Sequence, residues 1–286
     1  MLNQQEPTVF IDNLIFPESL RWRSDKLYFS DIHAYEVVAV DLDGTRKTII
    51  RVPGNPGGLG FLPDGRLLVA SMTERKLLRL DNGMVDLVAD IIPWAAAQIN
   101  DILVDKTGRC YIGQFGADIW SGKTYLPADL LMVSPSGQVT QVASDIHFGN
   151  GMALTQDGKT LIIAETRIFR LTAFDVNRDG TLRNRRVWAD LGSLPPDGIC
   201  LDGEGNIWVA APRGPDGGGF FRIKEGGKID TMFQSKGYGG FSCMLGGPDR
   251  KTLFMGESKV SRPPPTTRDN GRIKMVRVSV AGSGLP

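Results

Sequence analysis

SLPPDGICLDGEGNIWVAA, residues 193–211, reads as a short strand, a turn and a second strand. Apolar runs stand on either side of a Gly-rich turn, which is the pattern of an antiparallel hairpin. One carboxylate, Asp197, stands directly ahead of the first apolar run. A buried strand offers a charged group no water, so this residue needs a partner. The rest of the chain indicates what this partner is. The same strand–turn–strand unit recurs along the chain, and another residue stands at the position of Asp197 each time.

Five further segments match this unit in register. They are ESLRWRSDKLYFSD from Glu18, GGLGFLPDGRLLVAS from Gly57, NDILVDKTGRCYIGQ from Asn100, NGMALTQDGKTLIIAE from Asn150 and SCMLGGPDRKTLFMGE from Ser242. The six starts lie 39 to 50 residues apart, and a turn glycine follows the start by eight residues in four units. Asp-Gly dipeptides, a common turn signal, recur at 43, 64, 157, 179, 197, 202 and 216. A period of about 40 to 50 residues with several strands in each is typical of a β-propeller.

The sequence therefore predicts an all-β fold, a single six-bladed β-propeller domain over residues 1–286. A further strand pair follows each hairpin, as in KLLRLDNGMVDLVA at 76–89, so each blade has four antiparallel strands. An isolated strand at 8–16 precedes the first unit, and 271–280 ends the last. We expect this N-terminal strand to join the last blade, which closes the ring and removes an open sheet edge.

Composition limits the classes of partner. The chain is 41% hydrophobic and 23% charged, with a net charge of +1. Its charges form no basic arm or acidic tail, which argues against nucleic acid and anionic membrane surfaces. The three cysteines lack metal-type spacing and are expected to be buried thiols. The first ten residues lack a signal-peptide pattern, and no apolar run reaches the roughly 18 residues of a membrane span. We expect a cytoplasmic protein, monomeric or weakly homo-oligomeric, with a small-molecule substrate.

The first residues of the six units face one another in a propeller, because the innermost strand of each blade surrounds the axis. These residues, the axial slots, are Glu18, Gly57, Asn100, Asn150, Asp197 and Ser242. Four of them carry carboxylate or amide oxygens, which are the ligands of hard cations such as Ca²⁺, Mg²⁺ or Mn²⁺. Asn, Asp and Ser also cap turns. Oxygen-bearing side chains at four of six aligned positions nevertheless favour a metal site on the axis over turn capping.

The segments PESLRW…LYFSDI, INDILVDKTGRCYIG, GNGMALTQDGKTLIIAE and PPDGICLDGEGNIWVA resemble those of the senescence marker protein, gluconolactonase and luciferin-regenerating enzyme family. The likeness covers nearly the whole chain. It implies a six-bladed propeller with one catalytic divalent metal, in a family that often hydrolyses sugar lactones. It also implies that Glu18, Asn150 and Asp197 hold the metal, while Asn100 contacts substrate or acts as a ligand. Ca²⁺ is the first choice of ion, with Mn²⁺, Mg²⁺, Zn²⁺ and Fe²⁺ as alternatives.

One position departs from the family pattern. Sugar-lactonase members commonly have an arginine two residues before the asparagine of the third unit, whereas this chain has Gln98. Glutamine forms hydrogen bonds but brings no charge and has a shorter reach. Its neighbourhood, which includes Trp94, three alanines and Ile99, is apolar. We predict that Gln98 contacts the substrate, which is a sugar lactone or a more hydrophobic lactone or ester.

Loops near the predicted axis supply the remaining candidates. They are His147 and Phe148, just ahead of the fourth unit, and Trp120 and Tyr125, within the long third unit. The first two are predicted to line the substrate pocket. The other two, in the extra residues at 114–131, either cover the substrate or pack on their own blade. No role is predicted for His33 or for the Pro-rich segment 261–272.

The leading hypothesis is a divalent-metal-dependent hydrolase that opens a lactone ring. The metal polarises the carbonyl group and stabilises the oxyanion, and Asp197 is the candidate general base for the attacking water. A carboxylate bound to a cation is a weaker base, so activation of the water by the metal stays open. The alternatives are an esterase, organophosphate hydrolase or lyase on the same scaffold, and a non-catalytic propeller that binds a metal and a ligand.

Overall fold

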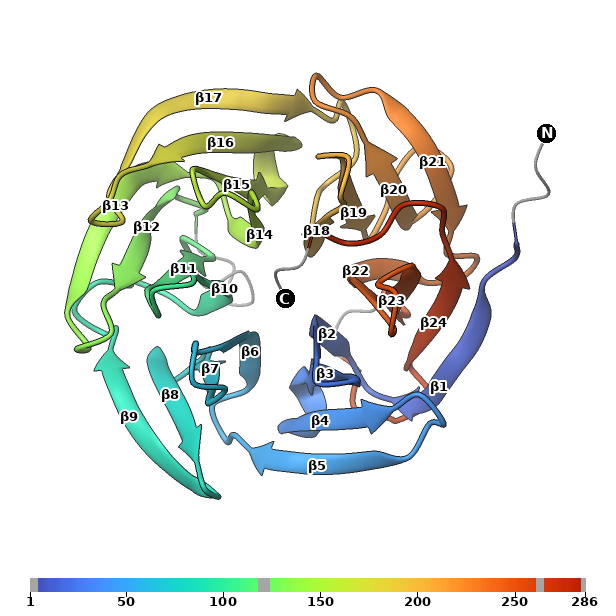
Figure 1. The fold of residues 1–286 in the computed structure, drawn as a ribbon, viewed down its shortest axis with the longest axis horizontal. Helices are drawn as coiled ribbons and strands as arrows, with labels where there is room; N and C mark the ends of the chain where they lie inside the picture. Colours follow the sequence, from blue (N-terminus) through green and yellow to red (C-terminus); the bar gives the residue numbers. More distant parts are fainter. Residues whose placement is uncertain (1–4, 118–123, 261–264, 284–286) are drawn as a thin grey trace.

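The chain forms a ring of six four-stranded antiparallel sheets around a central axis (Figure 1). The computed structural model describes residues 5–117, 124–260 and 265–283. Within these ranges the only helical elements are two short 3₁₀ turns, η1 (Ile32–Ala34) and η2 (Thr166–Ile168). The predicted six-bladed propeller with four strands in each blade is therefore confirmed. No helix in the described ranges has the length and apolar character needed to cross a membrane.

Each of the first three blades runs along the chain from its innermost to its outermost strand. Blade 1 has β2 (Pro17–Arg23), β3 (Lys26–Asp31), β4 (Glu36–Asp41) and β5 (Arg46–Arg51). Blade 2 has β6 (Pro56–Phe61), β7 (Leu67–Ser71), β8 (Lys76–Asp81) and β9 (Met84–Asp90). Blade 3 has β10 (Ile99–Val104), β11 (Cys110–Gln114), β12 (Ala128–Val133) and β13 (Val139–Ile146).

Blades 4 and 5 repeat this order, and blade 6 combines both ends of the chain. Blade 4 has β14 (Gly149–Leu154), β15 (Thr160–Glu165), β16 (Arg170–Val176) and β17 (Leu182–Asp190). Blade 5 has β18 (Ile199–Leu201), β19 (Ile207–Ala211), β20 (Gly219–Ile223) and β21 (Ile229–Gln234). Blade 6 has β22 (Gly239–Gly246), β23 (Thr252–Ser258), β24 (Gly271–Arg277) and, outermost, β1 (Thr8–Leu14).

The ring is closed by the first strand, as expected. β1 pairs antiparallel with β24, with Thr8 opposite Met275 and Leu14 opposite Gly271. The last blade therefore contains strands from both ends of the chain, which lie side by side in Figure 1. This pairing supplies β24 with a neighbour that it would otherwise lack.

The strands are most buried near the axis and most exposed at the rim, and their residues change from apolar to polar in the same direction. All six residues of β14 are buried, because neighbouring blades cover both faces of an inner strand. The outermost strand of the same blade, β17, has the sequence LRNRRVWAD and is exposed over most of its length. Between the blades, aromatic side chains fill the core, as where Trp22 stacks on Phe254 with ring centroids 5.5 Å apart. The three cysteines are buried and form no disulfide, as predicted.

Glycines after two axial slots allow neighbouring inner strands to approach closely. A Cβ atom on Gly151 would lie 2.5 Å from the backbone nitrogen of Ile199 in the next blade. One on Gly198 would lie 2.8 Å from the Cα atom of Ser242. The Asp-Gly pair at 197–198 is therefore not the hairpin turn that the dipeptide suggests. Its glycine makes room for the adjacent blade, and its aspartate is left at the axis.

Candidate functional site

The predicted oxygen-bearing slots lie together at one end of the axis. Glu18, Asn100 and Asn150 belong to the inner strands β2, β10 and β14, and Asp197 lies two residues before β18. Asn150 and Asp197 are 6% and 8% exposed, whereas Glu18 and Asn100 are half-buried. A backbone hydrogen bond from Gly151 to the Asp197 carbonyl joins the fourth and fifth slots.

Irregular pairing between the first and second strands of the blades changes the direction in which the slot side chains point. In five inner strands the register with the second strand shifts at the slot, between Glu18 and Arg21, Pro56 and Leu59, Ile99 and Ile102, Gly149 and Met152, and Gly240 and Ser242. In the sixth, the paired strand starts only after Asp197. A β-bulge takes a residue out of the in-out alternation and redirects its side chain. The bulges therefore explain how polar residues ahead of apolar strands avoid the packed faces of the blades.

The two slot carboxyls lie close enough to affect each other. Burial raises the pKa of Glu18 well above its ordinary value, and the charges of Asp197 and Asp101 raise it further. Burial raises the pKa of Asp197 to about 8, against the opposing effects of the Asn150 amide and the Gly198 N–H group. The chain thus does not balance the negative charge that either carboxyl group would carry when ionised. A bound cation would supply the balancing positive charge and reverse both pKa shifts.

The slot amides are oriented with their oxygens uncommitted. Asn150 Nδ2 donates to Thr166 Oγ1 at 3.2 Å, and the Thr166 hydroxyl donates in turn to the Pro196 carbonyl at 2.7 Å. Asn100 Nδ2 donates to the Gly149 carbonyl at 3.2 Å. Both amides therefore use their nitrogens to contact the protein. In the described part of the chain no group donates to either Oδ1, so each remains an available acceptor.

This donor set fits a hard divalent cation. Two carboxyls and two amide oxygens, with water, match the all-oxygen coordination of Ca²⁺. Residues 5–117, 124–260 and 265–283 contain no group of three or more His, Cys, Asp or Glu side chains placed to hold a metal. The candidate centre has only two such groups, Glu18 and Asp197, and depends on the amides of Asn150 and Asn100 for the rest.

A buried ion pair, which the sequence interpretation missed, lies directly beside the slots. Arg21 donates to Asp101 Oδ1 at 2.7 Å and to the Ile102 carbonyl at 2.8 Å. These two charged residues are 4% and 5% exposed. Arg21 also lines a cavity of only about 20 Å³ farther along the axis, together with apolar side chains and Ser283. The cavity beyond the ion pair is therefore too small for a ligand of the size of a lactone.

Half-buried aromatic side chains stand beside the slots. Phe148 packs against Phe115, with ring centroids 4.5 Å apart. On the other side of the ring, Phe16 packs against Phe241 at 4.5 Å and against His33 at 5.3 Å. Burial lowers the pKa of His33, which favours its neutral form. Of these residues only Phe148 was predicted, because an isolated Phe ahead of a strand carries no signal of function.

The other predicted substrate contacts lie around Phe148. The Gln98 carbonyl accepts from Phe115 N–H at 3.1 Å, and its side-chain Oε1 is buried with no partner among the described residues. Tyr125 lies 6.1 Å from His147, centroid to centroid, and beneath the Arg167 guanidinium. Burial raises the pKa of Tyr125 to about 12, so its hydroxyl stays protonated. The predicted residue Trp120 falls outside the described ranges, as do parts of 114–131 and 261–272.

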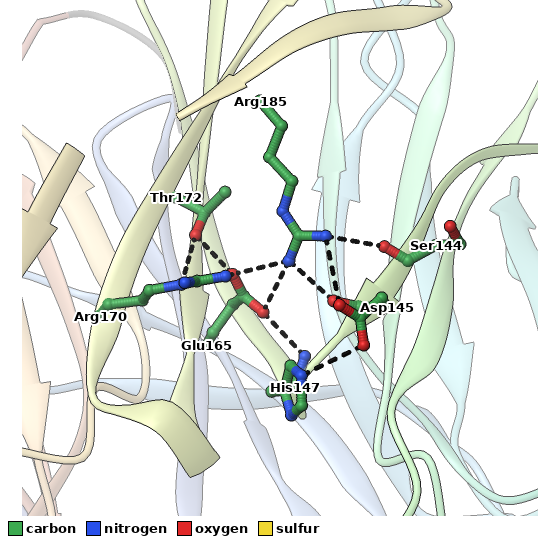
Figure 2. Close-up of polar contacts among 7 residues, drawn as sticks. All are labelled: Ser144, Asp145, His147, Glu165, Arg170, Thr172 and Arg185. Atoms are coloured by element: carbon green, nitrogen blue, oxygen red, sulfur yellow. Dashed lines mark hydrogen bonds and ion pairs between the residues drawn. The ribbon is translucent and has the colours of Figure 1, made fainter. Parts of the chain in front are cut away.

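His147 is held by a polar network centred on Glu165, shown in Figure 2. Glu165 Oε2 accepts from the His147 backbone N–H at 2.8 Å, and His147 Nε2 lies 3.2 Å from Asp145 Oδ1. Glu165 also accepts hydrogen bonds from Thr172, from Arg170 at 3.0 Å and from Arg185 at 3.3 Å. Glu165 is fully buried, with 0% of its surface exposed.

The network determines the charge state of Glu165. Burial alone would raise the pKa of Glu165, but the Thr172 hydroxyl, the His147 N–H and the two arginines hold it below its ordinary value. The carboxylate is therefore charged at neutral pH and fixes the segment that leads to Phe148 and Asn150. A sequence signal existed in hindsight, because Glu165 is an acid at the end of an apolar strand, as Asp31 is in blade 1.

Comparison with known proteins identifies the family and the fold of this chain. A family model described as SMP-30/Gluconolactonase/LRE-like region matches residues 16–259. A 6-deoxy-6-sulfogluconolactonase from Pseudomonas putida is 26% identical over 92% of this chain and 91% of its own. Among solved structures, a luciferin-regenerating enzyme superposes with a TM-score of 0.82 at 18% identity, over 98% of this chain and 99% of its own.

A second solved structure, a calcium-binding regucalcin from Agrobacterium tumefaciens, has a TM-score of 0.80 at 20% identity, over 99% of this chain and 97% of its own. Both structural likenesses concern the fold, which they share over nearly its full length. The family match covers most of the chain, including Glu18, Asn100, Asn150 and Asp197. This chain therefore belongs to the SMP-30/gluconolactonase/LRE-like family, as its sequence resemblance implied.

Proposed function

We propose that the protein is a divalent-metal-dependent hydrolase that opens a lactone ring. The observation that carries the proposal is the convergence of Glu18, Asn150 and Asp197 at one end of the axis, with raised carboxyl pKa values and an uncommitted amide oxygen. Membership of a family that includes lactonases supports the reaction type. Ca²⁺ is the first choice of ion, because every candidate ligand atom is an oxygen.

The chain's own residues divide the work as follows. Glu18, Asn150 and Asp197 would hold the ion, which when bound supplies polarisation of the lactone carbonyl. Asp197 would take the proton from the attacking water as general base. Asn100, fixed through its Nδ2 atom, would present Oδ1 as an acceptor to the ion or to a hydroxyl group of the substrate. The buried Arg21–Asp101 pair lies beside the site and has its charges balanced within the chain, so it would not compete for the ion.

A panel of lactones, carboxylic esters and phosphotriesters tests the proposal. Protein loaded with Ca²⁺ or Mn²⁺ should hydrolyse at least one lactone class, EDTA should abolish the activity, and the ion should restore it. Elemental analysis of the same samples should find about one ion per chain. Preference for a phosphotriester or an open-chain ester would contradict lactonase activity. Metal-loaded protein that binds lactones without turnover would identify a binding propeller instead.

A further inference from the structure

Two pairs of aromatic rings flank the slots on opposite sides of the ring. Phe16 and Phe241 come from blades 1 and 6, and their ring centroids lie 4.5 Å apart. Phe115 and Phe148 come from blades 3 and 4, also at 4.5 Å. All four residues are half-buried. Blades 2 and 5 separate the two pairs (Figure 1).

Backbone hydrogen bonds fix these rings next to the predicted ligands. Phe16 lies two residues before Glu18, and its carbonyl accepts from Ile32 N–H at 3.1 Å. Phe241 directly precedes Ser242, and its carbonyl accepts from Gly198 N–H, next to Asp197, at 2.8 Å. The aromatic pairs are therefore part of the same rigid frame as the slots and are not side chains of a distant surface.

Phe148 is held in an unfavourable backbone conformation. Its φ angle is 61°, in the left-handed region that bulky residues rarely adopt. The conformation is maintained from both sides, because Thr166 N–H donates to the Phe148 carbonyl and Glu165 binds the preceding N–H of His147. Strain of this kind persists where the surrounding structure enforces it, and it gathers at functional sites.

Few polar groups in the described residues around these rings are left without a partner. Arg21 is committed to Asp101 and to two carbonyl groups. Gln98 Oε1 and the Tyr125 hydroxyl are buried without a partner among the described residues, and His147 Nε2 lies 3.2 Å from Asp145 Oδ1. A sugar lactone would bury several hydroxyls, and each one left unpaired weakens binding. A hydrocarbon substituent has no such requirement and gains from contact with the rings.

We infer that the substrate is a lactone with an apolar alkyl or aryl substituent, bound between the Phe16–Phe241 and Phe115–Phe148 pairs. This inference rests on the proposed lactonase function and makes its substrate class specific. The lactone ring lies at the slots, and the substituent lies against one aromatic pair.

A chain-length series tests the inference. We would measure kcat/KM for γ-butyrolactone, γ-hexalactone, γ-nonalactone and dihydrocoumarin, and compare them with glucono-1,5-lactone on metal-loaded protein. Each methylene that contacts the rings should raise kcat/KM by up to about fourfold. The best apolar lactone should exceed the aldonolactone by about 100-fold or more.

Two variants locate the effect. Phe148→Asn keeps a residue that tolerates the left-handed conformation, and Phe241→Ser alters the opposite pair. At least one should flatten the chain-length series at unchanged metal content and melting temperature. Met232→Ser is the control, because Met232 is 47% exposed on the outermost strand β21. It should leave the whole series unchanged.

The outcomes separate the two proposals. Faster hydrolysis of the aldonolactone, with no dependence on chain length, would overturn the apolar substrate class and leave the lactonase function standing. A normal chain-length dependence in both Phe variants would overturn the assignment of the substituent to these rings. Metal-loaded protein that hydrolyses no lactone at all would overturn the proposed function, and the substrate class with it.

Discussion

Two buried carboxyl groups of this propeller have opposite electrostatic surroundings. Glu165 is surrounded by a hydroxyl, a backbone N–H and two arginines, and its pKa is lowered. Asp197 has one amide and one N–H, opposed by the charge of Asp101, and its pKa is raised to about 8. Burial is a feature of both sites, so the supply of donors decides the direction of the shift. The Glu165 site is complete within the chain, whereas the axial site requires a cation or a proton.

The largest effect should follow from changing the axial acid. Asp197→Asn keeps an oxygen of similar shape but removes the charge and the basic site, so turnover should fall by about 100-fold or more. Folding should survive, because the variant removes an acid that the metal-free protein does not neutralise. Steady-state kinetics, metal content and melting in EDTA would be compared with wild type. Near-normal hydrolysis at full metal occupancy would make Asp197 only a ligand and direct attention to another base, such as His147.

Metal affinity should depend steeply on pH. The pKa of Asp197, about 8 in the folded protein, lies above its ordinary value of 3.8, so below pH 8 an ion must displace a proton. Apparent Ca²⁺ affinity should therefore rise up to about tenfold per pH unit from pH 6 to 8 and then level off. Because the pKa of Asp197 is higher in the folded than in the unfolded chain, this group stabilises the metal-free fold fully below about pH 4. That contribution to stability is lost as the pH rises through about 8. Calorimetric titration measures the affinity. A Ca²⁺ affinity that does not change between pH 6 and 8 would contradict the raised pKa of Asp197.

Changing Glu165 should affect stability more than metal binding. Glu165→Gln leaves two arginines without their carboxylate, and we expect a loss of about 2 kcal/mol, since those arginines are partly exposed. Because the pKa of Glu165 is lowered, its contribution is present above about pH 4.5 and disappears as pH falls. Urea denaturation tests this. Glu204→Gln, at an exposed partner of Arg222, is the control and should cost less than about 0.5 kcal/mol.

A smaller effect should come from the hydroxyl that orients Asn150. Thr166→Val removes the acceptor of Asn150 Nδ2 and the donor to the Pro196 carbonyl with little change in shape. Metal affinity should fall by about tenfold, the lower end for groups that position a ligand. Thr155→Val is the control, because Thr155 lies in the turn between β14 and β15 of the same blade, and this variant should leave metal affinity unchanged. Equal affinity of Thr166→Val and wild type would show that Asn150 needs no such support.

The ring, its closure and the slots were predictable because their signals are local. Turn glycines and apolar runs recur at a regular period, and six copies of a weak pattern reinforce one another. The partners of Glu165 were not predictable, since they come from β16, β17 and the segment before β14. Gly198 resembled a turn residue, but the backbone of Ser242 in the next blade is what requires it. Long-range packing of this kind leaves no periodic trace in a single sequence.

The shared last blade makes completion of the propeller depend on the last of its strands to be synthesised. Among the described strands of the propeller, β1 is synthesised first, yet its partner β24 is synthesised last. Five blades contain only consecutive strands and can assemble in the order of their synthesis. The sixth must wait until the final strands emerge and meet a strand made long before. Until β24 is made, β1 has an unpaired edge, so the nascent chain exposes this strand until β24 pairs with it.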